Sequence, residues 1–304
     1  MTVSQADDLV TTHAVPGPPL PLGRRIHLPG RGTTFVREVA GPPGAPTIVL
    51  LHGWMASGGL NWFTVFGALG EHFRVVAPDL RGHARGIRSR RRVTLKDCAD
   101  DVSVLIEHLD CGPAIVAGYS LGGPVAQLLW KRHREQVAGL VFCATADHVV
   151  AGMREQLIFG TAMAVAAGTT RTGQLLYRVP VRRLRRMLPR GTAARPATLR
   201  EWAGAEMRRH NWRMIMEAGV AMSSYNARRW IGQVDVPTAV LVTTRDRALP
   251  PLAQLRLALD IPGATVHRIE DGHVACAKSS FAPPFVAACL DVADRARAGN
   301  DHDW

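Results

Sequence analysis

The sequence of 304 residues predicts an α/β fold whose mostly parallel sheet is covered by helices on both faces. The first observation is a set of continuous apolar runs, such as TIVLLHG at 47–53, which are typical of strands buried on both faces. The second is that these runs alternate with segments that carry apolar residues at helical spacing, as at 94–109. The third is IVAGYSLGGPVAQLL at 115–129, where a strand becomes a helix within a few residues. Such alternation favours parallel strand pairing.

The individual elements follow from the same patterns. RRIHLP and TTFVREV flank the turn GRG and predict a pair of short strands at 24–29 and 33–39. The remaining strands are expected, in chain order, at 47–53, 73–80, 115–118, 137–146, 238–246 and 264–270. Helices are expected at 94–109, where Thr94 can cap the start, at 121–129, near 252–259 and from about 282.

The alternation of strands and helices stops between about Asp147 and Gln233. This segment has helical periodicity, for example in MREQLIFGTAMAVAAG, and contains no run typical of a buried strand. We interpret residues 147–233, called the cap segment below, as a helical insertion over one end of the sheet. The core is then expected at 23–146 and 234–304, and it is preceded by a flexible, proline-rich extension over 1–22.

The formal net charge of +12 is concentrated in the cap segment. Fourteen arginines stand between Arg171 and Arg229 against three acidic residues, which leaves +11 in this stretch. No nucleic-acid recognition motif accompanies the charge, so no nucleic-acid partner is expected. The arginine pairs of YRVPVRRLRRMLPR predict either a solvated face or a contact with an anionic membrane surface or an acidic substrate group.

The cysteines and the apolar runs indicate where the protein acts. The five cysteines are dispersed and form no CxxC pair, which indicates reduced thiols rather than a disulfide framework or a zinc site. No apolar run reaches the length of about 18 residues expected of a membrane-spanning helix. The N-terminus lacks the basic and apolar parts of a secretory signal. We therefore expect a cytoplasmic protein without a metal site, with peripheral membrane contact as one alternative.

Ser120 stands where the strand at 115–118 turns into a helix. Gly118 and Gly122 flank it at two residues on either side, as a sharp turn without room for side chains requires. The helix that follows directs its free N-terminal N–H groups and positive dipole end at the same point. Such a position suits a serine nucleophile whose reaction produces an oxyanion.

With these residues the chain resembles the α/β-hydrolase superfamily, specifically members with a helical cap inserted after the sixth strand. The resemblance extends over roughly 24–298 and rests on motifs in a fixed order: LLHGW, PDLRGHARG, GYSLGG, TTRDRALP and DGH. It implies a sheet of about eight strands, onto which the predicted strands can be mapped. It also implies that GYSLGG is a nucleophile turn; no GK[ST] follows, as a phosphate-binding loop would need.

The resemblance implies a base and an acid for Ser120. Its base lies in a loop after the last strand, where this chain has His273. Its acid follows the next-to-last strand, where this chain has Asp246, although two threonines replace a glycine that the family often has nearby. Some relatives carry the acid after the sixth strand instead, so Asp147 is the reserve candidate.

The resemblance also implies an oxyanion hole made of two backbone N–H groups. One belongs to the residue after the nucleophile, which is Leu121, and the other to Trp54 in the loop after LLHG. His52 and His83 fall in other motifs of the family, where histidine has a supporting role. Asp79 is likewise expected to tie loops together near the site.

The branches of this family that dehalogenate substrates or hydrolyse epoxides use an aspartate as the nucleophile. The serine at this position predicts acyl chemistry instead. Hydrolysis of a lipophilic carboxylic ester is the main expectation, without a cofactor. Thioester hydrolysis, acyl transfer, perhydrolysis and C–C hydrolysis use similar triads, and a non-catalytic ligand-binding protein is a further alternative. Apolar residues of the cap segment, among them Met153, Leu157, Met214 and Met222, could line the substrate pocket or form the core of the cap.

Overall fold

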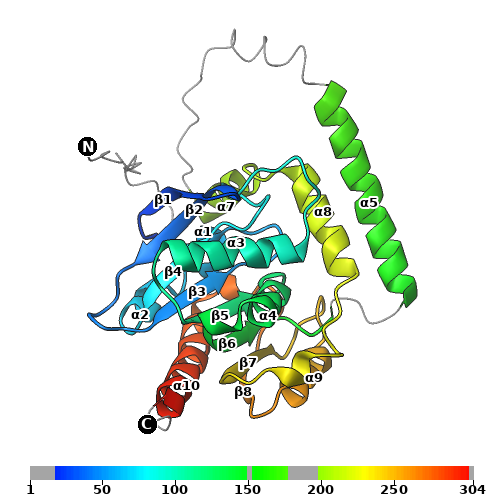
Figure 1. Cartoon of the computed structure of the whole chain (residues 1–304). Coiled ribbons are helices and arrows are strands. Elements are labelled where there is room, and N and C mark those ends of the chain that lie inside the picture. The colour runs from blue at the N-terminus through cyan, green and yellow to red at the C-terminus, as the bar shows by residue number, and fades with distance from the viewer. Residues whose placement is uncertain (1–17, 149–152, 177–197, 301–304) are drawn as a thin grey trace, which may run out of the picture.

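The computed structural model of the chain describes residues 18–148, 153–176 and 198–300. An eight-stranded sheet lies at its centre, with the strand order β1-β2-β4-β3-β5-β6-β7-β8 (Figure 1). Its strands are β1 (Gly23–Leu28), β2 (Gly32–Val39), β3 (Thr47–Leu51), β4 (Arg74–Pro78), β5 (Ala114–Tyr119), β6 (Val137–Cys143), β7 (Thr238–Thr243) and β8 (Thr265–Ile269). Only β2 pairs antiparallel, with β1 and β4, and the other pairings are parallel. The predicted mostly parallel sheet of eight strands is confirmed.

Helices cover both faces of this sheet. The described helices are α1 (Gly58–Trp62), α2 (Phe66–Gly70), α3 (Leu95–His108), α4 (Gly122–Arg132), α5 (Met153–Leu176), α7 (Leu199–Met207), α8 (Trp212–Ser223), α9 (Pro251–Asp260) and α10 (Ala282–Asn300). Side chains of α3, α4, α8 and α9 share one buried cluster, and those of α1, α2 and α10 share another. The fold therefore has three layers, with the sheet between two apolar clusters.

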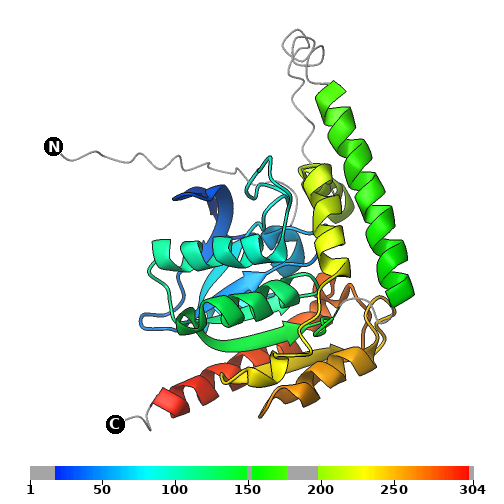
Figure 2. The ribbon, with the colours of Figure 1, turned by 45° about the vertical axis from the view of Figure 1, so that its right-hand side comes forward.

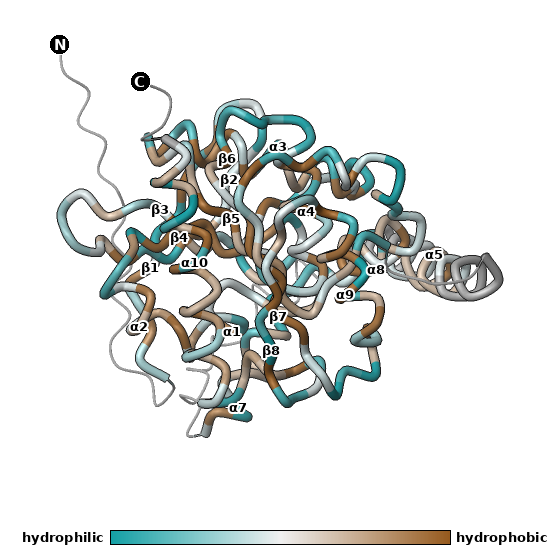
Figure 3. The backbone as a smooth tube through the Cα atoms, turned by 90° about the horizontal axis from the view of Figure 1, so that it is seen from below, coloured by the Kyte–Doolittle hydropathy of each residue, from teal (hydrophilic) through white to brown (hydrophobic). Residues whose placement is uncertain are grey.

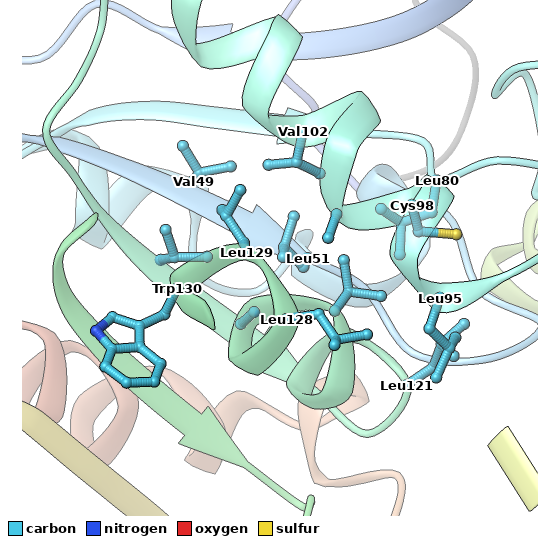
Figure 4. Close-up of a cluster of buried hydrophobic side chains, with 14 of the residues drawn as sticks. Val49, Leu51, Leu80, Leu95, Cys98, Val102, Leu121, Leu128, Leu129 and Trp130 are labelled. Carbon is cyan, nitrogen blue, oxygen red and sulfur yellow. The ribbon is translucent and has the colours of Figure 1, made fainter. Parts of the chain in front are cut away.

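Strand β3 shows how the apolar runs produce these two clusters. Successive side chains of a strand point to opposite faces. Val49 and Leu51 accordingly pack towards α3 and α4, as Figure 4 shows, whereas Ile48 and Leu50 belong to the cluster on the other face. A strand covered on both sides needs apolar residues at every position, which explains the continuous run. Figure 3 shows the same distribution along the chain, with hydrophobic central strands and mostly hydrophilic loops around them.

The three helices α5, α7 and α8 follow β6 and precede β7, where the sequence predicted a helical insertion. Helices α5 and α8 lie side by side beyond the end of the sheet (Figures 1 and 2). The two helices are so close at Gly219 of α8 that a Cβ added there would lie 3.0 Å from the Met163 side chain of α5. In the described ranges, no helix is long and apolar enough to cross a membrane.

Candidate active site

A tight turn joins β5 to α4 and carries Ser120. The backbone φ of Ser120 is +49°, in the left-handed region that a residue other than glycine seldom adopts. Three hydrogen bonds hold this conformation: the Ser120 N–H donates to the Cys143 carbonyl (3.0 Å), and the Ser120 carbonyl accepts from the Gly123 N–H and the Thr145 hydroxyl (2.9 Å each). A strained residue held by its surroundings is a common feature of functional sites.

Glycines flank Ser120 because the backbone passes too close for any side chain. A Cβ on Gly118 would lie 2.4 Å from the Gly122 carbonyl oxygen. A Cβ on Gly122 would lie 2.0 Å from the carbonyl oxygen of Leu51, at the end of β3. Both contacts are with backbone atoms, which cannot turn aside as a flexible side chain can. The two glycines predicted from the motif are thus required by the packing of β3, β5 and α4.

Replacing Gly122 by alanine is therefore expected to destabilise the protein by about 3 kcal/mol, because the added methyl group forces β3 and α4 apart. Urea unfolding of the wild type and Gly122→Ala measures the change. Gly67→Ala in α2 is the matched control, since no atom beyond the adjacent residues and the backbone of its own helix lies within 4 Å of a Cβ at Gly67. That variant should be neutral or stabilised by up to about 1 kcal/mol. Equal destabilisation of the two variants would contradict this explanation of the turn.

The structure brings Ser120, His273 and Asp246 into one hydrogen-bonded chain. Ser120 Oγ lies 2.9 Å from His273 Nε2, and His273 Nδ1 lies 2.8 Å from Asp246 Oδ2. These residues come from three loops at the same edge of the sheet, after β5, β7 and β8. The carboxyl ends of parallel strands meet there, which is where α/β folds place their sites.

The carboxylate of Asp246 is buried and almost fully hydrogen-bonded. Its Oδ1 accepts from the N–H groups of Ala248 and Leu249 (2.9 Å each), and its Oδ2 accepts from the Thr243 hydroxyl (2.9 Å) as well as from His273. Burial by itself would raise the pKa of Asp246, but the hydrogen bonds outweigh it and hold that pKa below its usual value. Asp246 is therefore charged at neutral pH and can stabilise a positive imidazole.

Two residues that the sequence did not single out support this chain. Thr243, one of the two threonines that replace the glycine of the family pattern, donates a hydrogen bond from its hydroxyl to Asp246. Tyr119 donates its hydroxyl to the backbone carbonyl of His273 (2.7 Å) and so ties the loop after β8 to the end of β5. Tyr119 adjoins Ser120 in the motif, but nothing in the sequence indicates the direction of its side chain.

Asp147, the reserve candidate for the acid, is engaged elsewhere. Its fully buried carboxylate lies 2.6 Å from His148 Nδ1 and 3.4 Å from Arg228 Nε. His148 also forms an isolated bridge with Asn226. These contacts join the two ends of the cap segment to each other. The hydrogen bond to His273 is made by Asp246 instead.

An apolar cavity of about 500 Å³ opens beside Ser120 and His273. Its walls come from the loop after β3, from α1, from α7 and from the loop that carries His273. The lining residues are Gly53, Trp54, Ala56, Leu60, Asn61, Phe63, Tyr119, Ser120, Leu199, Arg200, Trp202, Ala203, His273, Val274, Cys276 and Ala277. The volume lies within the range of about 300–1,000 Å³ that is typical of small-molecule sites.

The two residues predicted for the oxyanion hole both lie near Ser120. Leu121 follows it directly and precedes the first turn of α4, whose N–H groups lack acceptors within the helix. Trp54 lines the cavity. Gly53, just before Trp54, approaches Ser120 closely, because a Cβ on Gly53 would lie 3.4 Å from Ser120 Cβ. Its N–H donates to Asn61 Oδ1 (3.0 Å), which fixes the path of this loop.

The methionines proposed to line the substrate pocket have a different place. Met214 and Met222 are buried in the cluster between the sheet and α3, α4, α8 and α9, and neither lines the cavity beside Ser120. Met214 packs against the backbone turn at Gly82. This corrects the expectation for these two residues: the apolar face of α8 covers the core. Met153 and Leu157 lie within α5, at positions whose side chains fall outside the described residues.

Three buried histidines lie where the cap segment meets the core. The rings of His52 and His83 have centroids 5.0 Å apart, and those of His83 and His210 have centroids 5.7 Å apart. His52 Nε2 accepts from the Leu80 N–H, and His210 Nδ1 accepts from the Ala84 N–H. Burial lowers the pKa of all three, to about 3 for His52. The three rings are therefore neutral at pH 7.

Acid is expected to destabilise the protein through these histidines. Each has a lower pKa in the folded protein than its ordinary value of 6.5, which it takes when unfolded, so the unfolded chain binds more protons below pH 6.5. The contribution of these histidines to stability is therefore fully present above pH 6.5. As pH falls below 6.5, the free energy of unfolding decreases by about 1.4 kcal/mol per pH unit for each proton taken up on unfolding. Urea unfolding at pH 7.5, 5.5 and 4.5 measures this slope.

The variant His83→Phe isolates the effect, because His83 Nε2 has no hydrogen-bond partner among the described residues. The unfolding free energy of this variant should depend less steeply on pH, by the amount that corresponds to one proton taken up on unfolding, about 1.4 kcal/mol per pH unit. Asp79, whose pKa is raised by burial, acts in the opposite sense in both proteins and cancels in the comparison. Identical slopes for the two proteins would show that His83 takes up no proton on unfolding.

An ion pair also joins the cap segment to the core. The two terminal nitrogens of the Arg85 guanidinium donate to the two carboxylate oxygens of Glu206 in α7 (2.7 and 2.9 Å), and the Ser57 hydroxyl donates to the same carboxylate. Asp79, which was predicted to tie loops together, accepts from the N–H groups of Gly58 and Arg85. No cluster of three His, Cys, Asp or Glu side chains able to hold a metal ion occurs in the described ranges.

Comparison with known proteins relates this arrangement to a family. Residues 46–278 match the family described as alpha/beta hydrolase fold. The chain is 30% identical over 244 residues to the magnesium-chelatase 30 kDa subunit of Rhodobacter capsulatus, covering 77% of this chain and 82% of that protein. It is 31% identical over 220 residues to the pimeloyl-(acyl-carrier protein) methyl ester esterase of Sodalis glossinidius, covering 67% and 76%.

A solved structure shares the fold at lower identity. The thermophilic esterase from Thermogutta terrifontis superposes with a TM-score of 0.65 at 22% identity, covering 92% of this chain and 99% of that one. The sheet order, the turn at Ser120 and the match over 46–278 agree with one another. The chain therefore belongs to the alpha/beta hydrolase fold family.

Proposed function

We propose that the protein is a serine hydrolase that cleaves lipophilic carboxylic esters through an acyl-enzyme. The observation that carries this proposal is the hydrogen-bonded chain from Ser120 through His273 to Asp246, which opens into an apolar cavity. A serine hydroxyl becomes a nucleophile when a neighbouring base accepts its proton and a third group orients that base. The side chain of Asp246 is fully buried and that of His273 is 30% exposed, so of these two residues the base is the one that a substrate can reach.

Each residue has a defined part in the proposed reaction. His273 Nε2 accepts the proton as Ser120 Oγ attacks the ester carbonyl carbon, and the N–H groups of Leu121 and Trp54 stabilise the oxyanion. The intermediate collapses, the alcohol leaves with the proton from His273, and an acyl group remains on Ser120. Water then attacks this ester with His273 as the base, and His273 returns the proton to Ser120 Oγ as the carboxylic acid product is released. Asp246 holds the imidazole in position throughout.

The cavity favours a substrate with an apolar part near the scissile bond. Leu60, Phe63, Trp202 and Ala203 line it, and the guanidinium-bearing Arg200 is the one side chain with a formal charge among its lining residues, His273 taken as neutral. An apolar wall contributes about 25 cal/mol per Å² of apolar surface removed from water. The esterase of Sodalis glossinidius, by its name, acts on a methyl ester whose acyl group is carried by a protein. The cavity supports a lipophilic substrate, and the name of the relative supports a carboxylic ester.

Labelling and turnover test this proposal together. A fluorophosphonate probe should label the wild type at Ser120, because the probe reacts with an activated serine. A panel of p-nitrophenyl esters of graded chain length, run beside a thioester and a C–C substrate, should show the highest kcat/KM for an ester. Preference for the thioester or the C–C substrate would assign one of the other acyl chemistries. Absence of labelling with a folded protein would favour the non-catalytic, ligand-binding alternative.

Contact with an anionic membrane surface is a separate proposal. It concerns Arg182, Arg183, Arg185 and Arg186, which lie outside the described residues. Replacing all four by glutamine should reduce sedimentation with anionic vesicles, since each cation near such a surface contributes about 1 kcal/mol. Salt should weaken the association of the wild type. Hydrolysis of a small soluble ester should remain nearly unchanged. Equal sedimentation of both proteins at low salt would leave the arginines as a solvated face.

A further inference from the structure

A second cavity, of about 660 Å³, lies away from Ser120. It is lined by the start of α3 with the loop before it, by α4, α5 and α8, and by the segment that follows α8. The lining residues are Arg92, Val93, Thr94, Leu95, Lys96, Leu128, Ala164, Ala167, Gly168, Glu217, Val220, Ala221, Ser224, Tyr225, Asn226 and Trp230. None of them lines the cavity beside Ser120. The proposed ester chemistry therefore leaves this cavity without a role.

Helix α8 and Trp54 stand between the two cavities. Trp54 lines the cavity of Ser120, and its indole N–H donates to the Ile215 carbonyl of α8 (2.9 Å). Its ring also packs on Gly219, where a Cβ would lie 3.3 Å from Trp54 Cζ2. Glu217 and Val220, on either side of Gly219, line the second cavity. A ligand in the second cavity would thus be separated from Ser120 by a helix and an indole ring.

The interior of the second cavity is apolar, and its polar groups are already bound. The Tyr225 hydroxyl donates to Gln127 Oε1 (2.8 Å). Glu217 accepts from Arg213 (2.6 Å) and from the Val93 N–H (3.1 Å), so its charge is neutralised within the protein. What remains exposed to a ligand are small and aliphatic side chains from α4, α5 and α8 and the indole of Trp230. Such walls suit a hydrocarbon chain.

One part of the exposed lining of this cavity, called its entrance below, carries positive charge. The side chains of Arg92 and Lys96 are exposed there, and neither side chain makes a hydrogen bond or an ion pair with a residue in the described part of the chain. Arg90 and Arg91, also exposed, precede them in the same loop. The nearest acid in sequence, Asp97, accepts from Thr94 and lies 3.4 Å from Arg31. The cations at the entrance are therefore available to an anion.

We propose that the second cavity is a binding site for a single-chain amphiphile with an anionic head group, of the class of a fatty acid. The hydrocarbon chain would lie along Leu128, Val220 and Ala221. The carboxylate would face Arg92 and Lys96, which are well placed for charge-assisted hydrogen bonds. This site is independent of the reaction proposed at Ser120, and its test does not need turnover.

Binding of dodecanoate, below the concentration at which it forms micelles, tests the proposal by titration calorimetry. The wild type should bind one equivalent, and it should bind dodecyltrimethylammonium much more weakly because the head group has the wrong charge. Arg92→Gln/Lys96→Gln should bind dodecanoate about tenfold more weakly, since two exposed charge contacts are lost. The matched control is Arg256→Gln/Arg268→Gln, which removes two exposed cations from α9 and β8 and should bind as the wild type does.

A pair of filled cavities distinguishes the two sites. Ala221→Trp fills the second cavity and should abolish binding, whereas Ala203→Trp fills the cavity of Ser120 and should leave binding intact. Loss of binding in Ala203→Trp but not in Ala221→Trp would overturn the proposal and place the amphiphile beside Ser120. Unchanged affinity in Arg92→Gln/Lys96→Gln would overturn it as well, and that variant alters only exposed side chains. Neither result depends on whether the protein hydrolyses esters.

Discussion

Replacing Ser120 by alanine is expected to abolish ester hydrolysis and to leave the fold unchanged. The Ser120 hydroxyl forms a hydrogen bond with His273 Nε2 (2.9 Å), and the three bonds that hold the turn all involve backbone atoms of Ser120. Alanine keeps these backbone contacts and the same Cβ. Loss of the nucleophile of a triad lowers kcat by a factor of about 10⁶.

The measurement is kcat/KM on a p-nitrophenyl ester, with the unfolding midpoint in urea as the check on the fold. Ser280→Ala is the control, because Ser280 is exposed and lies outside the proposed machinery; it should retain full activity. The fluorophosphonate probe should label Ser280→Ala and fail to label Ser120→Ala. Persistent hydrolysis by a pure preparation of Ser120→Ala would remove the proposed mechanism.

Replacing Asp246 by asparagine is expected to lower kcat/KM by about 10⁴, although the side chain hardly changes in size. The N–H groups of Ala248 and Leu249 require an acceptor at the position of Oδ1, so the amide oxygen of the variant stays there. The amide nitrogen then faces His273 Nδ1 in place of Oδ2. Because that nitrogen donates, His273 must accept at Nδ1 and carry its proton on Nε2. An imidazole in this form cannot accept the proton of Ser120.

Asp147→Asn is the matched control for Asp246→Asn. Asp147 is as deeply buried, but its partners are His148 and Arg228. Its change to asparagine should lower the unfolding midpoint and leave kcat/KM within about threefold of the wild type, as expected of a structural ion pair. If Asp147→Asn is inactive and Asp246→Asn is active, the acid of the proposed triad is Asp147.

Several features of this protein follow from short stretches of the chain alone. A strand buried on both faces needs an unbroken apolar run, and a strand that turns sharply into a helix needs glycines beside the turn. For this reason the eight strands, the helices α3, α4, α9 and α10 and the turn at Ser120 could be predicted from local sequence, and the structure agrees. The short helices α1 and α2 were not predicted. The resemblance carried by the order of the motifs then implied Asp246 and His273 as partners of Ser120, and in the structure all three follow strands that end at the same edge of the sheet.

Other features depend on contacts between distant segments, and only the tertiary structure decided them. Helical spacing marks Met214 and Met222 as one apolar face of α8, but it does not indicate whether that face covers the core or a pocket. The Tyr119 hydroxyl reaches the His273 carbonyl only because β5 and β8, far apart in the sequence, end at the same edge of the sheet. The second cavity exists because α3, α4, α5 and α8 leave a space that the described side chains do not fill. Periodicity states which face of an element is buried, whereas the partner of that face is set by packing across the whole chain.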